Sequence, residues 1–502
     1  MKKYLFFRVL RSILSIFLVT TLTFILIYTL IPRRDVFKDD NMISKLASKP
    51  DSLTDYKNNA FEKMNYLDYL DTKDLLARVA KDDPKTAVTA AHTASNKAAL
   101  TKWAKANNYT LHRFTVSKAY YATRDLPIWE RLSRFYGNMI KIDTPWTIHD
   151  KDNPNMPRYL KIQNDPLVGW AVVGSGTKYR YQLYFNSKFP YIHENFLKFD
   201  LGTSYPSYAG EPVTEVIGGT QGPADSVTKT FPNGRKLITS DDVYTRAYQP
   251  RKHRNEMDYE QYKDDYTSTE QLNRDPSMIG TSVRAGFIGL IISYALAIPI
   301  AIYMARKKGK WFDRAGTFVV TVLIAVPSLA FIYAFRYLGA SLFGLPDSFP
   351  TLGAQAWQSW VLPSVVLGLL GISGLIIWFR RFMIDQQKSD YVKFAKAKGL
   401  NENEIYTKHI FKNASIPIVQ GIPGSIIGLI GGATMTEEIF AAPGMGKMLP
   451  DSIAAHNNAV VIALVFIFTT IAVLSVLLGD IAMVIVDPRI KLSTSDTSKG
   501  EE

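Results

Sequence analysis

The sequence contains no cysteine and few residues in the arrangements typical of catalytic or metal-binding sites. Without cysteine no disulfide can form, so every folded part of the chain depends on its own core. The polar part of the chain holds scattered histidines without the spacing of a metal site, namely His92, His112, His149, His193 and His253. Neither a serine nucleophile elbow nor a Gly-x-x-x-x-Gly-Lys-Ser/Thr phosphate-binding loop occurs. These absences argue against an enzyme and against a nucleotide or metal site on this chain.

Charged residues are also missing from six long stretches of about 20 residues each, the length needed to cross about 30 Å of hydrocarbon. The stretches are Ser12–Ile31, Ala285–Ala305, Ala315–Phe335, Ser359–Phe379, Asn413–Thr436 and Ala459–Gly479. Buried helices of a large soluble protein would not produce six such runs. The sequence therefore predicts an all-α polytopic membrane bundle of six transmembrane helices.

The net charge of +14 does not indicate a nucleic-acid partner, because the basic residues gather in short loops between the predicted spans. Residues 380–412 hold eight Lys/Arg against four Asp/Glu, whereas 344–358 holds neither Lys nor Arg. Basic loops mark the cytoplasmic side of a membrane. We therefore expect a plasma-membrane protein with both termini cytoplasmic and residues 33–278 extracellular. The first run is longer than a signal-peptide core and lacks a cleavage site, so we expect a retained span.

Four parts follow along the chain. Residues 1–32 form the cytoplasmic N-terminus and first span, 33–278 an inserted extracellular domain, 279–490 a core of five spans, and 491–502 a cytoplasmic tail. The inserted domain reads as α+β. Its Ala-rich segment 86–107 is helical in character, and Trp170–Val173 and Lys178–Phe185 are strands, the second with Tyr179, Tyr181, Leu183 and Phe185 on its buried face. The polar segment 218–274 is expected to be partly a mobile loop.

Glycine and proline are frequent within the predicted spans. Gly424 and Gly428 are four residues apart, and Gly368, Gly371 and Gly374 recur every three, spacings that allow close helix packing. Pro299, Pro327, Pro363 and Pro423 are expected to kink their helices. Two charges lie at the edges of apolar runs. We expect Asp480 to cap or pair at the cytoplasmic end, and Arg336 either to line a path between the helices or to reach the membrane surface.

Between the fourth and fifth runs, the sequence predicts two short helices joined at a glycine. Asp390 is suited to cap the first, Gly399 to end it in a left-handed conformation, and Asn401 with Glu404 to begin a second helix reaching Lys412. A DNA-binding helix-turn-helix is excluded because membrane spans begin close by on both sides. Tyr391, Phe394 and Ala395 are expected on one face, suited to a groove on a partner. An amphipathic helix lying at the membrane surface is the alternative.

This segment, Asp390 to Leu400 followed by Lys408–Ala414 and Pro417, resembles the coupling-loop signature of ABC importer permeases of the dipeptide/oligopeptide/nickel branch. Further matches follow in chain order. They are Arg8–Arg11 with Leu30–Pro32, Asp200–Ser204 with Pro212, Val213 and Glu215, Glu437 or Glu438 with Phe440 and Pro443–Lys447, and Asp480 with Asp487–Ile490.

The resemblance implies a type I importer permease that works by alternating access, with no chemistry of its own. It implies a second homologous permease, two ATP-binding-cassette ATPase subunits that hold ATP and Mg, and an extracellular peptide-binding lipoprotein as partners, with lipid around the spans. It places ATPase coupling on Asp390, Tyr391, Phe394, Ala395, Ala397, Lys398, Gly399 and Leu400. Structural roles fall to Gly424, Gly428, Asp480, Asp487 and Arg489.

The chain departs from the family pattern in two places. The segment between the first two spans is much longer than usual and is similar to the insertion of streptococcal-type oligopeptide permeases, for which docking of the binding protein is our hypothesis. The stretch Ala455–Asn458 replaces a usual Arg-Asp pair. Oligopeptide import is the expected function. The alternatives are import of nickel or another small solute, and a membrane-anchored extracellular sensor or scaffold.

Overall fold

The computed structural model describes residues 2–82, 94–147, 153, 155–185, 191–250, 256–268 and 270–486. The chain divides into two compact units. The membrane unit comprises Met1–Arg33 and Ser277–Glu502, and the inserted unit comprises Arg34–Pro276.

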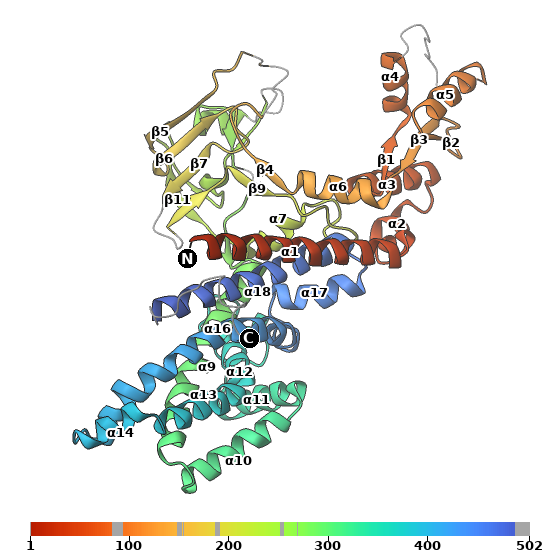
Figure 1. Ribbon diagram of the computed structural model, residues 1–502. Coiled ribbons are helices and arrows are strands. Elements are labelled where there is room, and N and C mark those ends of the chain that lie inside the picture. The colour runs from red at the N-terminus through yellow and green to blue at the C-terminus, as the bar shows by residue number, and fades with distance from the viewer. Residues whose placement is uncertain are drawn as a thin grey trace. The chain divides into compact units, whose positions relative to one another are not determined.

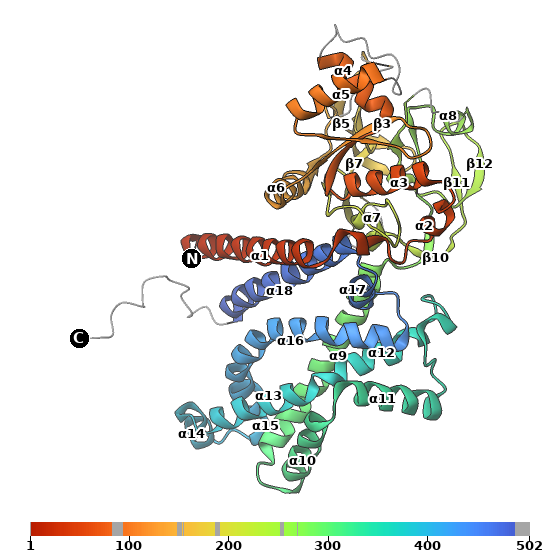
Figure 2. The same ribbon diagram turned by 90° about the vertical axis from the view of Figure 1, so that its right-hand side faces the viewer.

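The membrane unit is built from helices joined by short connections (Figures 1 and 2). They are α1 (Lys2–Leu30), α9 (Met278–Arg306), α10 (Trp311–Ala325), α11 (Ser328–Phe343), α12 (Gln358–Leu370), α13 (Ile372–Gln387), α14 (Asp390–Ala397), α15 (Glu402–Glu404), a π-helical segment (Ile405–Ile410), α16 (Phe411–Phe440), α17 (Met445–Ala454) and α18 (Asn458–Val486). Four stretches are long and apolar enough to cross a membrane as single helices, namely Phe6–Leu30, Met278–Arg306, Ile418–Phe440 and Asn458–Val486.

The third and fourth predicted spans are broken rather than continuous. The first break, between α10 and α11, bends the chain by 110°, and the second, between α12 and α13, by 45°. Pro327 explains the first, because proline lacks a backbone donor and forces the preceding Val326 out of the helical region (ψ 126°). Pro299 and Pro363, by contrast, lie inside unbroken helices. The described helices therefore supply four spans, or six if each bent pair crosses once.

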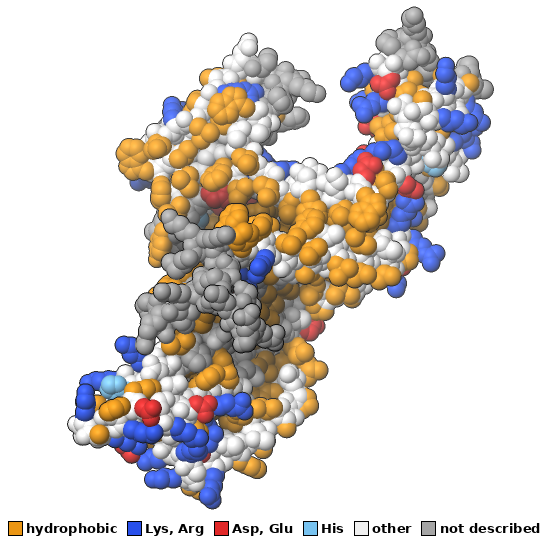
Figure 3. Space-filling view, in the orientation of Figure 1, with side chains coloured by type: hydrophobic (Ala, Val, Ile, Leu, Met, Phe, Trp, Pro, Cys, Tyr) orange, Lys and Arg blue, Asp and Glu red, His pale blue; other side chains and the backbone are white. Residues whose placement is uncertain are grey.

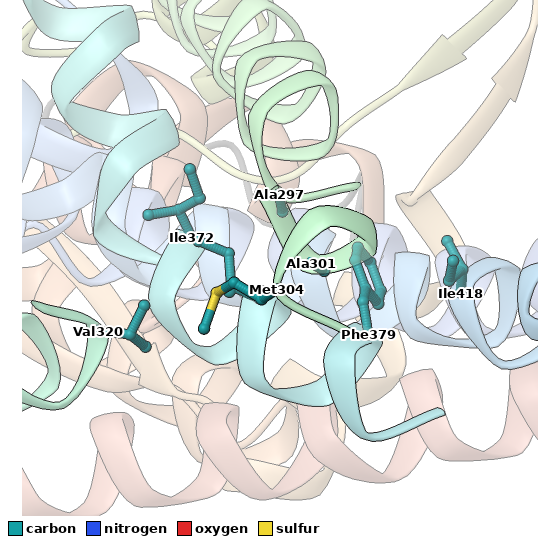
Figure 4. Packing of buried hydrophobic residues seen from close by; sticks show 8 residues of the cluster. Ala297, Ala301, Met304, Val320, Ile372, Phe379 and Ile418 are labelled. Carbon is teal, nitrogen blue, oxygen red and sulfur yellow. The ribbon is translucent and has the colours of Figure 1, made fainter. Parts of the chain in front are cut away.

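The core of the membrane unit lies between α9, α10, α13 and α16 (Figure 4). Ala297 and Ala301 on α9 are fully buried and leave room for the large side chain of Phe379 from α13. One turn before Ala297 on α9, Ser293 Oγ donates a hydrogen bond to the Gly368 carbonyl at 2.6 Å. A Cβ on Gly368 would lie 2.7 Å from the carbonyl oxygen of Gly289. Glycine is therefore required there by backbone-to-backbone contact between α9 and α12.

An ion pair joins the first and last helices of the membrane unit. Arg8 Nη2 of α1 lies 2.9 Å from Asp480 Oδ2 of α18, and both side chains are largely covered. Asp480 was expected to cap or to pair at the cytoplasmic end, and the structure places it beside Arg8 of the predicted first span.

The inserted unit is a mixture of helices and small antiparallel sheets. Its helices are α2 (Asn41–Leu46), α3 (Pro50–Lys63), α4 (Thr72–Asp82), α5 (Ala94–Ala106), α6 (Ile128–Asn138), α7 (Val213–Gly218) and α8 (Glu256–Tyr262). Its strands are β1 (Leu67–Leu70), β2 (Thr110–Arg113), β3 (Tyr120–Asp125), β4 (Ile140–Ile142), β5 (Tyr159–Asp165), β6 (Gly169–Ser175), β7 (Tyr181–Phe185), β8 (Ile192–Glu194), β9 (Leu197–Phe199), β10 (Gln221–Ala224), β11 (Val227–Thr230), β12 (Lys236–Thr239), β13 (Ala247–Tyr248), β14 (Tyr266–Thr267) and β15 (Asn273–Asp275).

Two of the sheets have more than two strands. One has the order β1-β3-β2 with α4 and α5 beside it, and the other has the order β5-β6-β7-β8 (Figure 1). The α+β expectation is confirmed for the described residues, and the helical expectation for 86–107 holds from Ala94, since 83–93 lie outside them. The segment 218–274 contains strand pairs β11–β12 and β13–β14 and is therefore not simply a loop.

The prediction of which β7 residues are buried is wrong for the second half of the segment Lys178–Phe185. Tyr181 is buried, but so is Tyr184, while Phe185 is exposed. The cause is a bulge in the pairing of β6 with β7 between Val172 and Val173, which shifts the register. A one-residue shift exchanges the two faces of a strand.

A cluster of charges stabilises the inserted unit beside β1. Asp68 accepts from Arg134 Nη1 at 2.6 Å and from Arg124 Nε at 2.9 Å. Glu130 Oε1 accepts from both arginines, at 2.8 and 2.9 Å. Burial alone would raise the pKa of Asp68, but the hydrogen bonds from Arg134 and Arg124 outweigh it and place that pKa below its ordinary value.

Replacing Asp68 with asparagine is expected to lower the stability of the purified chain by about 1–2 kcal/mol at pH 7, because two guanidinium groups lose their charged acceptor. A carboxyl whose folded pKa is lowered stabilises the fold above its unfolded pKa, and that contribution is lost as the pH falls through the folded pKa. Thermal unfolding of both chains from pH 7 to pH 3 checks this. The gap between them should close below about pH 4; a constant gap would show that the charge of Asp68 is unimportant.

Candidate functional site

The segment predicted to couple to a partner begins at the junction of α13 and α14. Ser389, whose backbone is extended, occupies the N-cap position of α14. Asp390 is the first residue inside the helix. The prediction that Asp390 is the cap is therefore wrong by one position. The Asp390 carboxylate instead pairs with Lys393 Nζ at 2.8 Å in solvent, and this bond lowers the pKa of Asp390.

One face of α14 is packed against its own chain. Val392 and Ala395, three residues apart, are 2% and 4% exposed. They belong to a cluster with Met383 and Ile384 of α13, Ile405 and Ile410 of the π-helical segment, Ala305 of α9 and Ala414 of α16. Tyr391 is half-buried at the edge of this cluster, and its hydroxyl donates to Gln386 Oε1 at 2.7 Å. The first α14 turn is therefore held rigidly on the ends of three longer helices.

The opposite face of α14 is exposed, and it carries a single large apolar side chain. Phe394 is 68% exposed, although its neighbour Ala395 is buried. The expectation that Phe394 and Ala395 share a docking face with Tyr391 is thus wrong for Ala395, which serves the internal core. Around Phe394 lie the exposed residues Lys393, Lys396, Ala397 and Lys398. Lys and Arg side chains gather at this end of the membrane unit (Figure 3, lower end).

The turn after α14 follows the predicted chemistry. Gly399 has φ +76°, the left-handed conformation that glycine adopts without strain, and Leu400 follows as a half-buried residue of the same cluster. Asn401 Oδ1 accepts from the backbone N–H of Glu404 at 2.9 Å and caps the next helix. That helix does not end near Lys412. It runs through the π-helical segment directly into α16, so α14 is mechanically connected to a spanning helix.

A buried ion pair that the sequence analysis did not identify fixes α13 near the same end. Asp313 of α10 accepts from Arg380 Nε at 2.6 Å and from Arg380 Nη2 at 2.7 Å. Its second oxygen also accepts from the backbone N–H of Gly309 at 2.8 Å. Bidentate pairing of this kind defines orientation as well as distance. Asp313 was recognisable as the lone acid in an otherwise basic loop, 306–314.

The membrane unit also contains an open cavity of about 740 Å³. Helices α9, α11, α12, α13 and α16 contribute its walls. Its lining comprises Ser293, Ser328, Leu367, Leu370, Gly371, Gly374, Leu375, Trp378, Gly421, Gly424, Ser425, Gly428, Leu429, Gly431 and Met435. Both helix breaks reach this cavity, at Ser328 and at Gly371. No charged side chain is among the described residues that line it.

The cavity changes the interpretation of Gly424 and Gly428. A Cβ on either would meet no atom within 4 Å, so within this chain they do not bring two helices together. The same holds for Gly371 and Gly374. Gly421 is the α16 glycine in close contact, since a Cβ there would lie 2.1 Å from the Trp378 ring. Sequence spacing alone could not separate these two kinds of glycine.

A buried carboxylate organises the turn after α16. Glu437 is 3% exposed and accepts from Ser282 Oγ at 2.6 Å and from the backbone N–H of Lys447 at 3.0 Å. Ser282 Oγ in turn accepts from the N–H of Met445 at 2.8 Å. A Cβ on Gly444 would lie 2.2 Å from the Glu437 carboxyl carbon. The two glycines of the Pro-Gly-Met-Gly turn are explained by this carboxylate and by Thr434, whose backbone lies 2.8 Å from a Cβ on Gly446.

Arg336 lies at the same end of α16 and not on the cavity wall. Its Nη1 donates to the Ile439 carbonyl at 2.9 Å, and its Nη2 lies 3.3 Å from Asp347. The Ile439 carbonyl belongs to the last turn of α16, where carbonyl groups lack partners within the helix. The structure therefore gives Arg336 a positioning contact. Asp487 and Arg489, for which structural roles are expected, lie outside the described residues.

Replacing Arg336 with glutamine is expected to lower the stability of the chain by about 1–3 kcal/mol, because a charged donor to the α16 terminus is lost. Thermal unfolding of the purified chain checks this. An unchanged unfolding temperature would show that Arg336 does not hold this end of α16.

Within the part of the chain that the structure describes, there is no group of three or more His, Asp or Glu able to hold a metal ion. The site thus consists of a rigidly based helix with one exposed aromatic side chain, and of a cavity between broken helices. Such an arrangement is suited to binding and to movement of helices.

Residues 297–492 match the family described as the binding-protein-dependent transport system inner membrane component. The oligopeptide transport system permease protein AmiC of Streptococcus pneumoniae is 51% identical over 497 residues, which cover 98% of this chain and 99% of that protein. The dipeptide transport system permease protein DppB of Lactococcus lactis subsp. cremoris is 30% identical over 228 residues, or 45% of this chain and 74% of the relative.

Among solved structures, a chain of the MetNI methionine ABC transporter in an inward-facing conformation aligns with a TM-score of 0.35 and 14% identity, over 41% of this chain and 93% of that one. This score is too low to support an argument about the fold. The match to AmiC, by contrast, includes the inserted unit as well as the membrane unit. Because that match runs through nearly the whole of both proteins, this chain belongs to the permease family that forms the inner membrane component of binding-protein-dependent transport systems.

Proposed function

We propose that this chain is a permease subunit of an ATP-driven importer that moves oligopeptides into the cytoplasm by alternating access. The observation that carries the proposal is the 51% identity to an oligopeptide transport system permease over 98% of the chain. Half-length similarity to a dipeptide permease agrees with peptide as the cargo class. The chain itself performs no covalent step, and two separate ATPase subunits hold ATP and Mg.

The cavity of the membrane unit supports a path for peptides. Along α16 it extends from Gly421 to Met435, which corresponds to about 20 Å at 1.5 Å per residue. About six residues of extended chain have that length. Its described lining is uncharged, so it offers no side-chain charge that would select one kind of residue. A second homologous permease is expected to close the open side.

The exposed face of α14 supports the coupling role. Phe394 is presented on a helix whose other face is fixed to the ends of α13, α9 and α16. One ATPase subunit would hold this helix in a groove. When the two ATPases close on each other, the movement would pass through the π-helical segment to α16, which borders the cavity. Asp390, Ala397, Lys398 and Gly399 lie at the exposed surface beside Phe394, whereas Tyr391, Ala395 and Leu400 act by seating the helix.

The basic end of the membrane unit supports a cytoplasmic location for α14. The proposal includes type I topology with six spans and places both termini on the same side as α14. The inserted unit would then lie outside the cell, where we propose that it docks a peptide-binding lipoprotein. The sheet β1–β3 with α4 and α5 has its own core, and removing residues 67–125 breaks no other strand pairing among the described residues.

Removal of residues 67–125 tests the docking role. The expected result is loss of lipoprotein association with retained assembly of the permeases and ATPases. If neither this deletion nor a larger one, 38–188, weakens association or uptake, the inserted unit has another role, such as that of a surface scaffold.

The proposed function is tested by disrupting the gene for this chain and measuring uptake of a labelled oligopeptide by whole cells. Uptake should fall to background and return when the intact chain is supplied. If peptide uptake were unchanged and uptake of nickel or another small solute were lost, the cargo of this chain would be that solute and not a peptide.

A further inference from the structure

The cavity is bordered by glycines that neither backbone conformation nor packing explains. Gly374 lies inside α13, and Gly424 and Gly428 lie inside α16. They are not among the residues with positive φ, so residues with a side chain, proline excepted, fit their backbone. A Cβ on each would meet no atom within 4 Å. Glycine within a helix is less stable than alanine, so its presence at these three positions requires a reason outside the fold of this chain.

Other glycines of the membrane unit show what a packing role looks like. A Cβ on Gly339 would lie 2.2 Å from Leu362, and one on Gly479 would lie 2.3 Å from Pro423. At Gly421 the Trp378 ring occupies the space. These glycines are needed by contacts within the chain. The open glycines are different because the space in front of them belongs to the cavity.

The arrangement around the cavity favours cargo over a partner helix as the occupant. Small residues that pair two helices recur along one face of a helix, the spacing that Gly424 and Gly428 have on α16. Gly374 of α13, however, borders the same hollow of about 740 Å³ from a second element. The remaining lining contributes hydroxyl groups at Ser293, Ser328 and Ser425, and the breaks at Pro327 and Gly371 bring helix ends to the wall. A path that admits peptides with side chains of different sizes requires unfilled volume of this kind.

We infer that Gly424 and Gly428 determine the largest peptide side chain that this permease admits. The inference rests on the proposed function, since it assigns to peptide cargo the space that these glycines leave free. Each glycine leaves a part of the cavity unfilled at the middle of α16, and a larger residue there would narrow the path without disturbing any contact within the chain. The two positions are thus specificity-determining for the size of the cargo and not for its charge.

The test uses the complete transporter reconstituted with its partner subunits, carrying Gly424 or Gly428 replaced by alanine and by leucine. Uptake is measured for labelled oligopeptides of equal length composed of small residues or of residues that include tryptophan and phenylalanine. Leucine at either position should reduce uptake of the bulky peptides at least tenfold and of the small peptides less than twofold, with alanine intermediate. The matched control is Gly286→Leu, since Gly286 also meets no atom within 4 Å but borders a different hollow.

Co-purification of all subunits accompanies each measurement. If leucine at Gly424 or Gly428 releases the partner permease, the glycines seat a neighbouring helix and the inference is overturned. Equal loss of both peptide classes from an assembled complex, in the alanine as well as the leucine variants, overturns it too, as does unchanged uptake of both. Failure of the unsubstituted complex to import any peptide would count against the proposed function itself.

Discussion

Replacing Phe394 with alanine is expected to leave the permease folded and to reduce peptide uptake by about tenfold or more. The side chain is 68% exposed and makes no contribution to the cluster beneath α14. Aromatic side chains that fill a partner's groove commonly contribute 2 kcal/mol or more to association, and 1.4 kcal/mol corresponds to a factor of ten. Peptide-stimulated ATP hydrolysis should fall with uptake, because in the proposed coupling both depend on contact between this helix and the ATPase.

The matched control is Val392→Ala, on the buried face of the same helix. It should lower thermal stability by about 1–3 kcal/mol through a cavity under α14, with smaller effects on coupling at temperatures where the chain is folded. If Phe394→Ala retained full uptake and full ATPase stimulation, the exposed face of α14 would not be the coupling surface. Lys393→Ala, which removes only a solvent-exposed ion pair, is expected to have little effect.

Replacing Glu437 with alanine is expected to destabilise the membrane unit by about 3 kcal/mol or more. The carboxylate is buried and joins α9, α16 and the first turn of α17 through Ser282 and the Lys447 N–H. Its removal would leave these donors without an acceptor in a place closed to water. Thermal unfolding of the purified chain measures the change.

Two further variants separate the charge of Glu437 from its shape. Glu437→Gln keeps an acceptor in place and should cost about 1 kcal/mol. Gly446→Ala places a methyl group 2.8 Å from the Thr434 backbone and should cost about 1–3 kcal/mol by overpacking. If Glu437→Ala were as stable as the natural chain, the carboxylate would not organise this turn.

Much of the membrane unit could be predicted from length and charge alone. A run of about 20 residues without charge has few alternatives to a membrane helix, and α1, α9, α16 and α18 cover four predicted runs. The breaks were harder to predict. Pro327 ends a helix, whereas Pro299 and Pro363 do not. The outcome depends on whether neighbouring helices satisfy the freed backbone groups, which a single sequence does not reveal.

The coupling segment was predicted in outline and corrected in detail. Gly399 and Asn401 act as expected because left-handed turns and helix caps depend on local chemistry. Which face of α14 is buried depends instead on distant residues such as Met383 and Ile410. The three-residue spacing of Val392 and Ala395 was the sequence signal for the buried face. The larger aromatic side chain of Phe394 pointed instead to the opposite face. Tertiary contacts therefore decided between two plausible faces.

The roles of the glycines were beyond sequence reasoning. Gly424 and Gly428 share the spacing of a helix-packing motif, yet their space is open, while Gly421 between them and the start of α16 is packed against Trp378. The need for Gly444 arises from Glu437, seven residues earlier, whose carboxylate occupies the place of a side chain. These requirements are spatial and leave no periodic signal.

The most direct test of oligopeptide import is uptake into liposomes that contain this chain with its second permease, two ATPases and the binding lipoprotein, with ATP supplied on the ATPase side. The proposed function predicts ATP-dependent accumulation of a labelled oligopeptide, competed by unlabelled oligopeptides and unaffected by nickel. Accumulation of nickel in place of peptide, or peptide uptake equal with and without this chain, would contradict it.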